Sequence, residues 1–391
     1  MSLAARQQRL DILLAAFQPL WHAQPFHEIR PAWCAAWPAL TAELLALDDA
    51  QEAQLAADDA LATAFVARHI RELDELPDLV RLAGPAASPL PDYGRFWAWG
   101  IPGRKRAQIE AFAAAARSSA LPVIDWCGGK GHLGRLLALH WEQGVTTLEI
   151  DARLCAAGEE LAERAGAQQR FVTTDVTHSA ACLRHGRHAV ALHACGDLHR
   201  SLVTQAATQG LVALDLAPCC YYRGIQGSYA PLSGALRNRL TADDARLAVT
   251  ELVTAAPRQA RQRDREMAWK LGFDAWRRMS SGVDAYRNFR PVPSAWMRGS
   301  FAEFMGQISR REGLPSPGAQ EMARLEQRGE ARRREVMRLS ILRHVFRRPL
   351  EIWLALDLAL RLENDGYAVS LGRFCERRLT PRNLLISARR T

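Results

Sequence analysis

The 391-residue chain holds 51 Lys or Arg and 42 Asp or Glu, a net charge of +9, and it is long enough to bury a substantial core. It has no run of 18 apolar residues, its first residues (MSLAARQQRL) carry charges where a signal peptide is apolar, and its eight cysteines lack a paired framework spacing. These features exclude a membrane-spanning or disulfide-rich secreted protein, so we expect a cytoplasmic protein with reduced thiols and no membrane partner. They leave the oligomeric state open.

The first part of the chain is expected to be helical. Apolar residues recur at spacings of three and four from Leu10 to Phe17 and again from Leu40 to Leu45. A linker rich in proline and glycine follows, and then a group of aromatic residues that we expect to pack against a domain: Gly84, Pro85, Pro89, Pro91, Tyr93, Phe96, Trp97 and Trp99. We therefore expect residues 1–99 to form a helical N-terminal domain.

A helix over residues 104–117 is expected to begin with Arg104, Lys105 and Arg106. Positive side chains are unfavourable at a helix N-terminus, where the helix dipole already places positive charge. Either an acidic neighbour or a substrate phosphate could compensate for them, and both explanations stay open.

The stretch LPVIDWCGGKGHLG, residues 121–134, is expected to organise the middle of the chain. Its apolar start predicts a short buried strand that ends at Asp125, and its glycines predict a tight turn before a helix. Such a turn lets the backbone approach a ligand, and the helix amides favour electron-rich groups. The loop alone is not decisive, because Gly129, Gly131 and Gly134 also fit the G-x-G-x-x-G pattern of dinucleotide enzymes.

Strands and helices then alternate along the chain. We expect strands over residues 145–150, 171–174, 188–193 and 211–216, and helices over residues 133–140, 153–165 and 198–208. This alternation predicts an α/β, doubly wound, mainly parallel sheet, in which ligands bind beyond the carboxyl ends of the strands. Asp125, Glu149 and Asp175 stand at three successive strand ends, and Glu149 is placed where an acid could hold both hydroxyls of a ribose.

The pattern stops after the fifth strand and resumes near residue 350. A helix over residues 352–362 precedes two strands, 367–374 and 383–387, whose connection without a helix predicts a hairpin. The expected sheet domain therefore comprises residues 100–216 and 350–391, with residues 217–349 as a helical insertion after strand 5.

The glycine loop and the three strand-end acids resemble the class I S-adenosylmethionine-dependent methyltransferases, which have a Rossmann-like seven-stranded sheet. In that family one acid serves the methionine end of S-adenosyl-L-methionine, a second the ribose and a third the adenine amine. The resemblance implies that the cofactor is bound by Asp125, Cys127, Gly129, Gly131, Glu149, Asp175 and His193, with Asp151 as a second candidate for the ribose. Cys127 departs from the family, which usually has a glycine there.

The hairpin of the last two strands resembles the reversed sixth and seventh strands of the methyltransferase fold. A dinucleotide-binding domain lacks such a hairpin, so it separates this interpretation from the competing one, a nicotinamide dehydrogenase.

The fourth and fifth strands are followed by HACGDL (193–198) and APCCYY (217–222). Together with GGKGHLG they resemble the methyltransferase domain of the glutathione-S-transferase C-terminal-domain-containing protein and of the ribosomal RNA adenine dimethylase domain-containing proteins. We expect the transferable methyl group to be faced by His193, Pro218, Cys219, Cys220 and Tyr221.

Three mechanisms could use these residues. In amine methylation, carbonyls of residues 218–222 would accept amine hydrogens while Tyr221 or Tyr222 stacks on a flipped base. In carbon methylation, Cys219 or Cys220 would be the nucleophile. A zinc site of His193, Cys195, Cys219 and Cys220 is the third option, but adjacent cysteines seldom bind one ion without strain, so no metal is expected.

Residues 257–350 contain 21 Arg or Lys against 10 Asp or Glu, with aromatic residues between them. This combination is typical of surfaces that track phosphates and stack bases, so we expect an RNA-modifying, RNA-binding methyltransferase that acts on a base of rRNA or tRNA. An ordinary amphipathic helical lid explains the same pattern. The alternatives are a methyltransferase acting on a protein or small molecule, and a non-catalytic RNA-binding scaffold.

Overall fold

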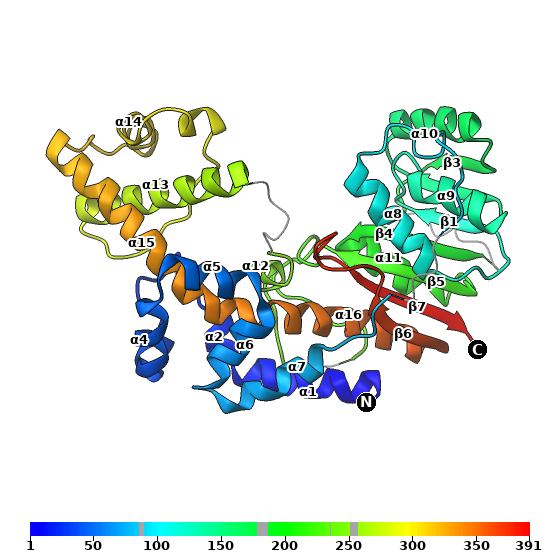
Figure 1. Cartoon of the computed structure of the whole chain (residues 1–391), viewed down its shortest axis with the longest axis horizontal. Helices are drawn as coiled ribbons and strands as arrows, with labels where there is room; N and C mark the ends of the chain where they lie inside the picture. The colour runs from blue at the N-terminus through cyan, green and yellow to red at the C-terminus, as the bar shows by residue number, and fades with distance from the viewer. Residues whose placement is uncertain (86–89, 178–186, 235, 251–256) are drawn as a thin grey trace. The chain divides into compact units, whose positions relative to one another are not determined.

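The computed structural model describes residues 1–85, 90–177, 187–234, 236–250 and 257–391 (Figure 1). The chain divides into two compact units, each built from separate segments. The sheet unit comprises Met1–Ala16, Asp78–Thr254 and Arg347–Thr391, and the helical unit comprises Phe17–Pro77 and Ala255–Phe346. Among the described residues, no helix combines the length and hydropathy that a membrane crossing needs.

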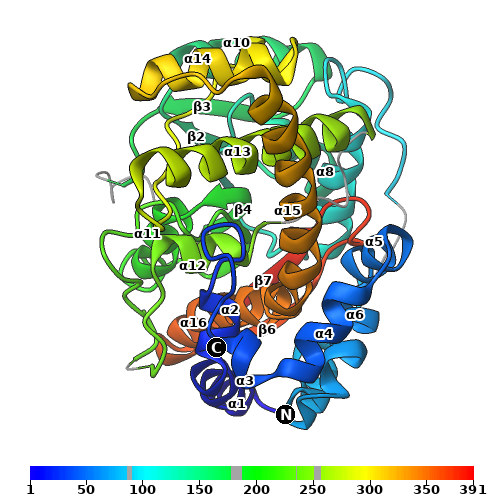
Figure 2. The ribbon, with the colours of Figure 1, turned by 90° about the vertical axis from the view of Figure 1, so that its left-hand side faces the viewer.

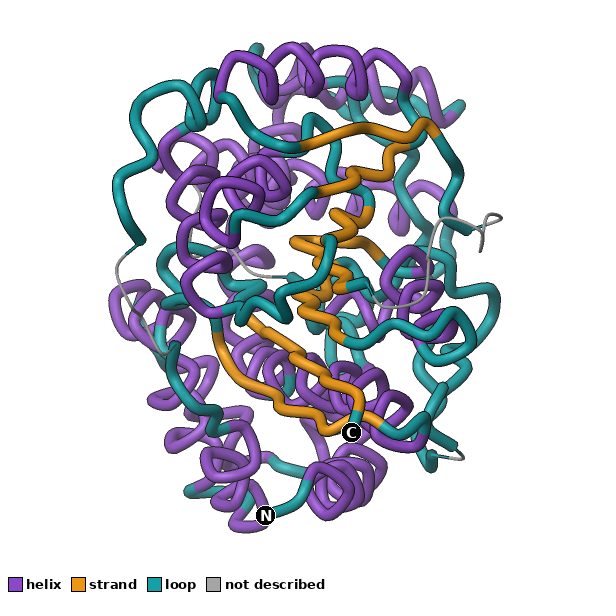
Figure 3. The backbone as a smooth tube through the Cα atoms, turned by 90° about the vertical axis from the view of Figure 1, so that its right-hand side faces the viewer, coloured by secondary structure: helices purple, strands orange, loops and turns teal. Residues whose placement is uncertain are grey.

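The sheet unit contains one seven-stranded sheet with the order β3-β2-β1-β4-β5-β7-β6, visible as one twisted array in Figure 3. Its strands are β1 (Val123–Trp126), β2 (Val145–Glu149), β3 (Gln169–Thr173), β4 (His188–Cys195), β5 (Ala213–Cys219), β6 (Tyr367–Arg373) and β7 (Leu384–Arg390). β1 to β5 are parallel, and β7 is antiparallel to both of its neighbours. The hairpin is confirmed, but only β7 is reversed, because β6 runs with the other strands.

Helices cover both faces of the sheet, as the alternation of side chains along β1 requires. Val123 packs with α8 (Gly103–Ala115) and α9 (His132–Trp141), while the indole of Trp126 donates to the carbonyl of Leu198 in α11 (Asp197–Ala206) at 3.0 Å. α10 (Ala152–Ala165) packs against β3, and α16 (Arg347–Asn364) packs against α11, β6 and β7. The doubly wound α/β fold is therefore confirmed.

α16 is buried along most of its length, and this burial explains why the first helix belongs to the sheet unit. α1 (Leu3–Ala16) packs on α16, and the Asp11 carboxylate accepts from the Trp353 indole at 3.1 Å and from the Asn238 amide at 2.7 Å. The buried Asp357 carboxylate accepts from the Tyr229 hydroxyl at 2.7 Å. The loop that contains Tyr229 and Asn238 leads to α12 (Ala242–Leu247), so residues 217–254 also belong to the sheet unit.

The helical unit joins N-terminal helices to the helices of the expected insertion. Its elements are α2 (Gln18–His22), α3 (Trp33–Ala36), α4 (Pro38–Ala46), α5 (Asp49–Ala57), α6 (Asp59–Ala67), η1 (Arg71–Glu75), α13 (Pro257–Ser281), η3 (Ser294–Met297), α14 (Phe301–Glu312) and α15 (Ala319–Val345); α7 (Leu76–Val80) spans the unit boundary. α13 and α15 cross closely (Figure 2), because Gly272 and Gly329 face each other at the crossing. The units therefore differ from the three expected domains, since residues 17–77 pack with residues 255–346.

Candidate functional site

The glycine loop between β1 and α9 has a left-handed backbone at Cys127, Gly129 and Gly131, whose φ angles are 56°, 60° and 61°. Cys127 thus adopts the conformation that glycine adopts most easily, and the loop keeps its shape at some cost in strain. A Cβ atom added to Gly128 would lie 2.2 Å from the Asp125 carboxylate, whereas one added to Gly129 would meet nothing within 4 Å. The loop therefore packs tightly against Asp125 at Gly128, whereas there is free space beside Gly129.

Asp125 lies under this loop. Its Oδ2 accepts hydrogen bonds from the amide of Gly134 and the hydroxyl of Thr147, both at 3.2 Å, and the residue is only 2% exposed. Burial raises the pKa of the carboxyl to about 6. Asp125 thus fixes the loop to β1 and β2, and its contact with the cofactor stays a prediction.

Glu149 ends β2 and faces the loop. Its Oε2 accepts from the amide of Gly129 at 3.0 Å, and its Oε1 accepts from the amides of Ile150 and Asp151 at 2.9 and 3.1 Å. Asp151 instead caps α10 and pairs with Arg153, with 3.2 Å between Oδ2 and Nη2. Of the two ribose candidates, Glu149 is thus the one in contact with the glycine loop.

Asp175 lies just beyond β3, where its Oδ1 accepts from the amide and hydroxyl of Thr177 at 2.9 and 2.6 Å. Burial, followed by the charges of Glu149, Asp125 and Asp175, raises the pKa of the Cys127 thiol to about 12. All three carboxylates therefore lie near Cys127, as the strand order predicted. The high pKa makes Cys127 a packing residue rather than a nucleophile.

Ile150, between Glu149 and Asp151, is a site candidate that the sequence analysis missed. Its side chain is 65% exposed, although large aliphatic side chains are usually buried. In the sequence, this isoleucine directly follows the acid that ends the strand. The sequence alone does not show whether such a residue is the last buried residue of the strand or an exposed residue beyond it.

His193 lies within β4, at a bulge between Leu192 and Ala194, and has a left-handed φ of 65°. Its Nε2 is 3.2 Å from Oε1 of Gln108 in α8. Burial, with smaller effects from nearby cations, lowers its pKa to about 4, so the imidazole is neutral at pH 7.

Three cysteines meet beside His193. Cys195 and Cys219 are the last residues of β4 and β5 and are partners in the parallel ladder, with 3.3 Å between their sulfurs. Cys220 follows with a left-handed φ of 45°, and the three sulfurs lie within 4.8 Å of one another. The Cys219 thiol also donates to the carbonyl of His193 at 3.2 Å.

Electrostatics distinguish the two adjacent cysteines. Hydrogen bonds from Cys195 and Cys219 lower the pKa of the Cys220 thiol to about 2. Hydrogen bonds with Cys195 and Cys220, followed by burial, raise the pKa of the Cys219 thiol far above its ordinary value. A thiolate at Cys220 is therefore stabilised by the two thiols beside it. Cys219 is a poor nucleophile, and Cys220 is the better one.

Pro218 lies within β5, so it ends the strand rather than following it. Tyr221 is 1% exposed, packs edge-on against His199 with ring centroids 5.4 Å apart, and has its hydroxyl buried. The expectation that Tyr221 faces the methyl group is wrong, because the ring is inside the core. Tyr222 is partly exposed and lies under the Arg246 guanidinium, 4.4 Å from its ring centroid.

Residues 104–224 match the family model of a methyltransferase domain. This part of the chain is a methyltransferase domain. The match spans under a third of the 391 residues, and the remaining strands, β6 and β7, complete the seven-stranded sheet. The match to a methyltransferase domain supports S-adenosyl-L-methionine as the cofactor.

Two solved structures are similar to parts of the chain. A TehB-like SAM-dependent methyltransferase from Corynebacterium glutamicum is 13% identical with a TM-score of 0.22, and the match covers 28% of this chain and 61% of that one. The glycopeptide N-methyltransferase MtfA, in complex with S-adenosyl-L-methionine, is 20% identical with a TM-score of 0.23, and the match covers 37% and 68%. No curated protein matches the chain significantly.

The methyltransferase domain carries two lysines near its site, Lys105 at the start of α8 and Lys130 in the glycine loop. Lys105 acts electrostatically on Asp125, His132 and His193, and Lys130 in the glycine loop acts on His132. Arg104 instead donates to the carbonyl of Leu379 at 2.9 Å, and Arg106 pairs with Glu110 at 2.9 Å. An acidic neighbour thus compensates for Arg106, while Lys105 lies close enough to the site residues to influence their charge.

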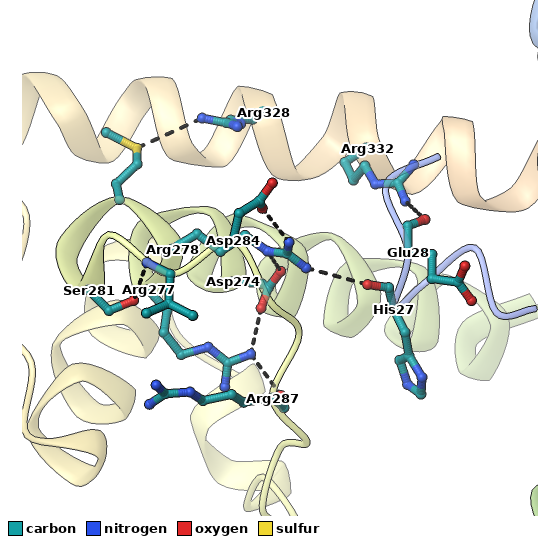
Figure 4. A network of polar contacts seen from close by, with 12 residues as sticks. His27, Glu28, Asp274, Arg277, Arg278, Ser281, Asp284, Arg287, Arg328 and Arg332 are labelled. Atoms are coloured by element: carbon teal, nitrogen blue, oxygen red, sulfur yellow. Dashed lines mark hydrogen bonds and ion pairs between the residues drawn. The ribbon is translucent and has the colours of Figure 1, made fainter. Parts of the chain in front are cut away.

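The arginines of the expected insertion make many contacts inside the helical unit. In Figure 4, Arg277 binds Asp274 and the carbonyl of Arg287, at 2.5 and 2.7 Å, and Arg278 binds Asp274 and Asp284, at 2.7 and 2.6 Å. Most of the interleaved aromatic residues are buried with one another or packed against that core: Trp269, Phe273, Phe301 and Phe304, with Trp276, Phe289 and Trp296 at its edge. Most of these aromatic side chains are therefore core residues, and three of them are partly buried at the edge of that core.

Charged residues are distributed between the two units differently from the distribution expected for the three domains. The helical unit has 22 Arg or Lys and 20 Asp or Glu, because residues 17–77 supply ten of the acids. Arg338 and Arg334, for example, lie 3.5 and 3.8 Å from the Asp49 carboxylate. The sheet unit has 29 basic and 22 acidic residues. Residues 257–350 are thus basic by themselves, but the acids of residues 17–77 largely balance them within the helical unit, and most of the net positive charge belongs to the sheet unit.

Proposed function

We propose that the protein transfers a methyl group from S-adenosyl-L-methionine to an acceptor at the carboxyl ends of β4 and β5. The observation that carries this proposal is the convergence of Asp125, Glu149 and Asp175 around Cys127 in the glycine loop. Glu149 and Asp175 fit a cofactor with a ribose and a purine amine, and the buried Asp125 fixes the loop that would face its amino-acid end. When bound, the cofactor supplies an electrophilic methyl group on a sulfonium sulfur.

The residues of the loop fit this cofactor. The open space at Gly129 leaves room for the cofactor beside the backbone, and the partly exposed Glu149 next to it would bind the ribose hydroxyls. The exposed Ile150 would cover the adenine ring, and Asp175 would accept from the adenine amine. Asp125 would act through the loop that it holds.

Calorimetric titration of the purified protein with S-adenosyl-L-methionine and its demethylated product tests this assignment. We expect binding to both, and at least a tenfold loss of affinity in Glu149→Ala, because the ribose hydroxyls lose their acceptor. Asp151→Ala is the matched control, since that carboxylate pairs with Arg153. Absence of binding to either ligand by the unaltered protein would overturn the assignment.

Two acceptor chemistries remain for the methyl transfer. In amine methylation, the backbone carbonyls of residues 218–222 would accept amine hydrogens, as the sequence pattern suggests. In carbon methylation, Cys220 is the proposed nucleophile, because its thiolate is stabilised and Cys219 is buried as a thiol. Cys220→Ala should then abolish methylation of a pyrimidine carbon, but leave methylation of an amine impaired and measurable.

We further propose RNA as the acceptor. Lys105 and Lys130 lie close to the site, Arg223 and Arg382 act on Cys220, and the sheet unit carries the positive surplus, so an anionic acceptor would be attracted. A protein or small-molecule acceptor is the alternative, and a non-catalytic RNA-binding scaffold is the third. The narrower resemblance to the glutathione-S-transferase C-terminal-domain-containing protein and to the ribosomal RNA adenine dimethylase domain-containing proteins stays a prediction.

Nucleoside mass spectrometry of RNA from cells with and without the gene, combined with methyl transfer by the purified protein to the RNA from cells without it, tests the acceptor. We expect one modified nucleoside to disappear without the gene and to be restored by the protein and cofactor. Unchanged RNA alongside cofactor binding would favour the protein or small-molecule acceptor. RNA binding without a methyl mark and without dependence on cofactor would favour the scaffold.

A further inference from the structure

The sulfurs of Cys195, Cys219 and Cys220 have the spacing of ligands around one ion. Zinc binds thiolates at about 2.3 Å, so two sulfurs of a tetrahedral site are about 3.8 Å apart. The observed separation of Cys195 and Cys219 is 3.3 Å, and all three sulfurs lie within 4.8 Å of one another. Small side-chain rotations are therefore enough to bring the three sulfurs to metal distances.

The backbone conformation at Cys220 allows two adjacent cysteines to bind one ion, which adjacent cysteines seldom do without strain. In a regular strand, Cys219 and Cys220 would point to opposite faces of the sheet. Cys220 instead has a φ of 45°, which breaks the alternation and directs its sulfur towards the other two. Left-handed backbone at a non-glycine residue is strained and is concentrated at functional sites.

The surroundings favour a cluster of thiolates. Three thiolates around a divalent ion leave one negative charge, and the guanidinium groups of Arg223 and Arg382 both act electrostatically on Cys220. Cys195 and Cys220 are partly exposed, so an ion can reach them from solvent, while Cys219 is buried. Soft thiolates select zinc over the hard ions magnesium and calcium.

Within the described residues, the group of possible ligands ends at three cysteines, which leaves a fourth position open. The imidazole of His193 does not belong to this group, and its Nε2 faces Gln108 at 3.2 Å. Three protein ligands and an open position are the arrangement of catalytic rather than structural zinc sites.

We propose that Cys195, Cys219 and Cys220 form a zinc site with one position open to solvent, beside the glycine loop. Cys195 also acts electrostatically on Cys127 of that loop, which places the site at the same edge of the sheet. This inference goes beyond the proposed function, because metal binding by the thiols does not depend on methyl transfer. It favours amine methylation over carbon methylation, because a Cys220 thiolate bound to zinc is not free to attack a carbon atom. It replaces the sequence-based expectation that no metal is bound.

Elemental analysis of the full-length protein, purified without chelator and dialysed, tests the site directly. We expect about one zinc per chain, and less than a fifth of that in Cys219→Ser and in Cys220→Ser. Cys34→Ser is the matched control, because Cys34 is a buried free thiol in the helical unit, and it should keep its zinc. Cobalt substitution should give the intense near-ultraviolet thiolate-to-cobalt bands, and these should disappear in the Cys220→Ser variant.

Three results would overturn the proposal. The first is unaltered protein that stays free of zinc after incubation with an equimolar amount of zinc ion. The second is a Cys195–Cys219 disulfide found by mass spectrometry of the native protein. The third is zinc content that is unchanged in both serine variants, which would mean that the ion is bound elsewhere. The metal content of the unaltered chain decides the matter even if a variant fails to fold.

Discussion

Asp125 is the strand-end acid whose surroundings differ most from those of a surface carboxylate. It is nearly fully buried and neither of its two hydrogen-bond donors, Gly134 and Thr147, carries a charge. Burial therefore dominates and raises its pKa to about 6. The folded chain holds this proton at pH values where the unfolded chain has already released it, so this carboxyl stabilises the fold most at low pH.

The Asp125→Asn variant tests this dependence on pH. The stabilisation is fully present below the unfolded pKa, near 4, and is lost as the pH rises through about 6, a difference of about 3 kcal/mol. Asparagine keeps an acceptor oxygen but does not titrate. The free energy of unfolding of the unaltered protein minus that of the variant, from urea unfolding without cofactor, should therefore fall by about 2 kcal/mol between pH 4 and pH 7, because the unfolded carboxyl is already partly ionised at pH 4. A constant difference would show that Asp125 titrates normally.

Gly128 and Gly129 separate packing of the loop from cofactor binding. In Gly128→Ala the new methyl group collides with Asp125 and Thr147, so we expect a destabilisation of about 2–3 kcal/mol. In Gly129→Ala there is room, and the left-handed backbone costs about 1–2 kcal/mol, but the methyl group occupies the space proposed for the cofactor.

Thermal unfolding and calorimetry distinguish these two glycine variants. Gly129→Ala should weaken cofactor binding at least tenfold with the smaller loss of stability. Gly144→Ala is the control, because a Cβ there meets nothing within 4 Å and its φ is not left-handed. Normal cofactor affinity in Gly129→Ala would contradict the assignment of this space to the cofactor.

At the scale of elements, the centre of the sheet is joined by a buried polar network. The Asp215 carboxylate in β5 lies 2.7 Å from Nε2 of His188 in β4 and accepts from Ser387 and Arg389 in β7, at 2.5 and 2.8 Å. Burial by itself would raise the pKa of Asp215, but these partners outweigh it and lower the pKa. The reversed strand β7 is thus attached to the parallel strands by charge as well as by the ladder.

Removing this carboxylate should be strongly destabilising. Asp215→Ala leaves the buried His188 without its acceptor and leaves Arg389 with backbone carbonyls only, and breaking a buried pair in this way typically costs about 3–5 kcal/mol. Ser387→Ala removes one hydrogen bond and should cost about 1 kcal/mol. Chemical denaturation of both variants provides the measurement, and a destabilisation below about 1 kcal/mol in Asp215→Ala would mean that the network is dispensable.

At the scale of the whole molecule, the two units use charge differently. The helical unit is nearly balanced, and several of its arginines bind acids or carbonyls of the same unit, as in Figure 4. The sheet unit has the surplus and includes Lys105 and Lys130 near the candidate site. The proposed RNA contact is therefore expected on the sheet unit.

Charge reversal in each unit tests where RNA binds. The double variant Lys105→Glu and Lys130→Glu should weaken RNA binding by at least tenfold. The slope of log affinity against log salt concentration should become shallower by about 0.7 for each phosphate that the variant no longer neutralises. The matched control is Arg287→Glu with Arg290→Glu, two exposed side chains of the helical unit, which should bind RNA normally. If the arginine variant instead bound RNA more weakly and the lysine variant bound it normally, the RNA-binding surface would lie on the helical unit.

The sequence pattern alone predicted the features that depend on residues close together in the chain. The apolar strands, the glycine turn and the acids that follow three strands predicted the sheet and its edge, because parallel strands bring their carboxyl ends together. The same logic placed Cys195, Cys219 and Cys220 at that edge. It did not predict the left-handed backbone at Cys220, because that conformation is fixed by the contacts around it.

Tertiary structure alone decided which segments pack together and which side chains are buried. Residues 17–77 supply acids to the basic helices of residues 255–346, Tyr221 lies in the core, and α1 packs on the buried helix α16. These pairings join residues that are hundreds of positions apart, so no local pattern in the sequence contains them. The physical reason is that charge balance and burial depend on the sum of all neighbours in space, whereas helix, strand and turn preferences depend on the nearest residues in the chain.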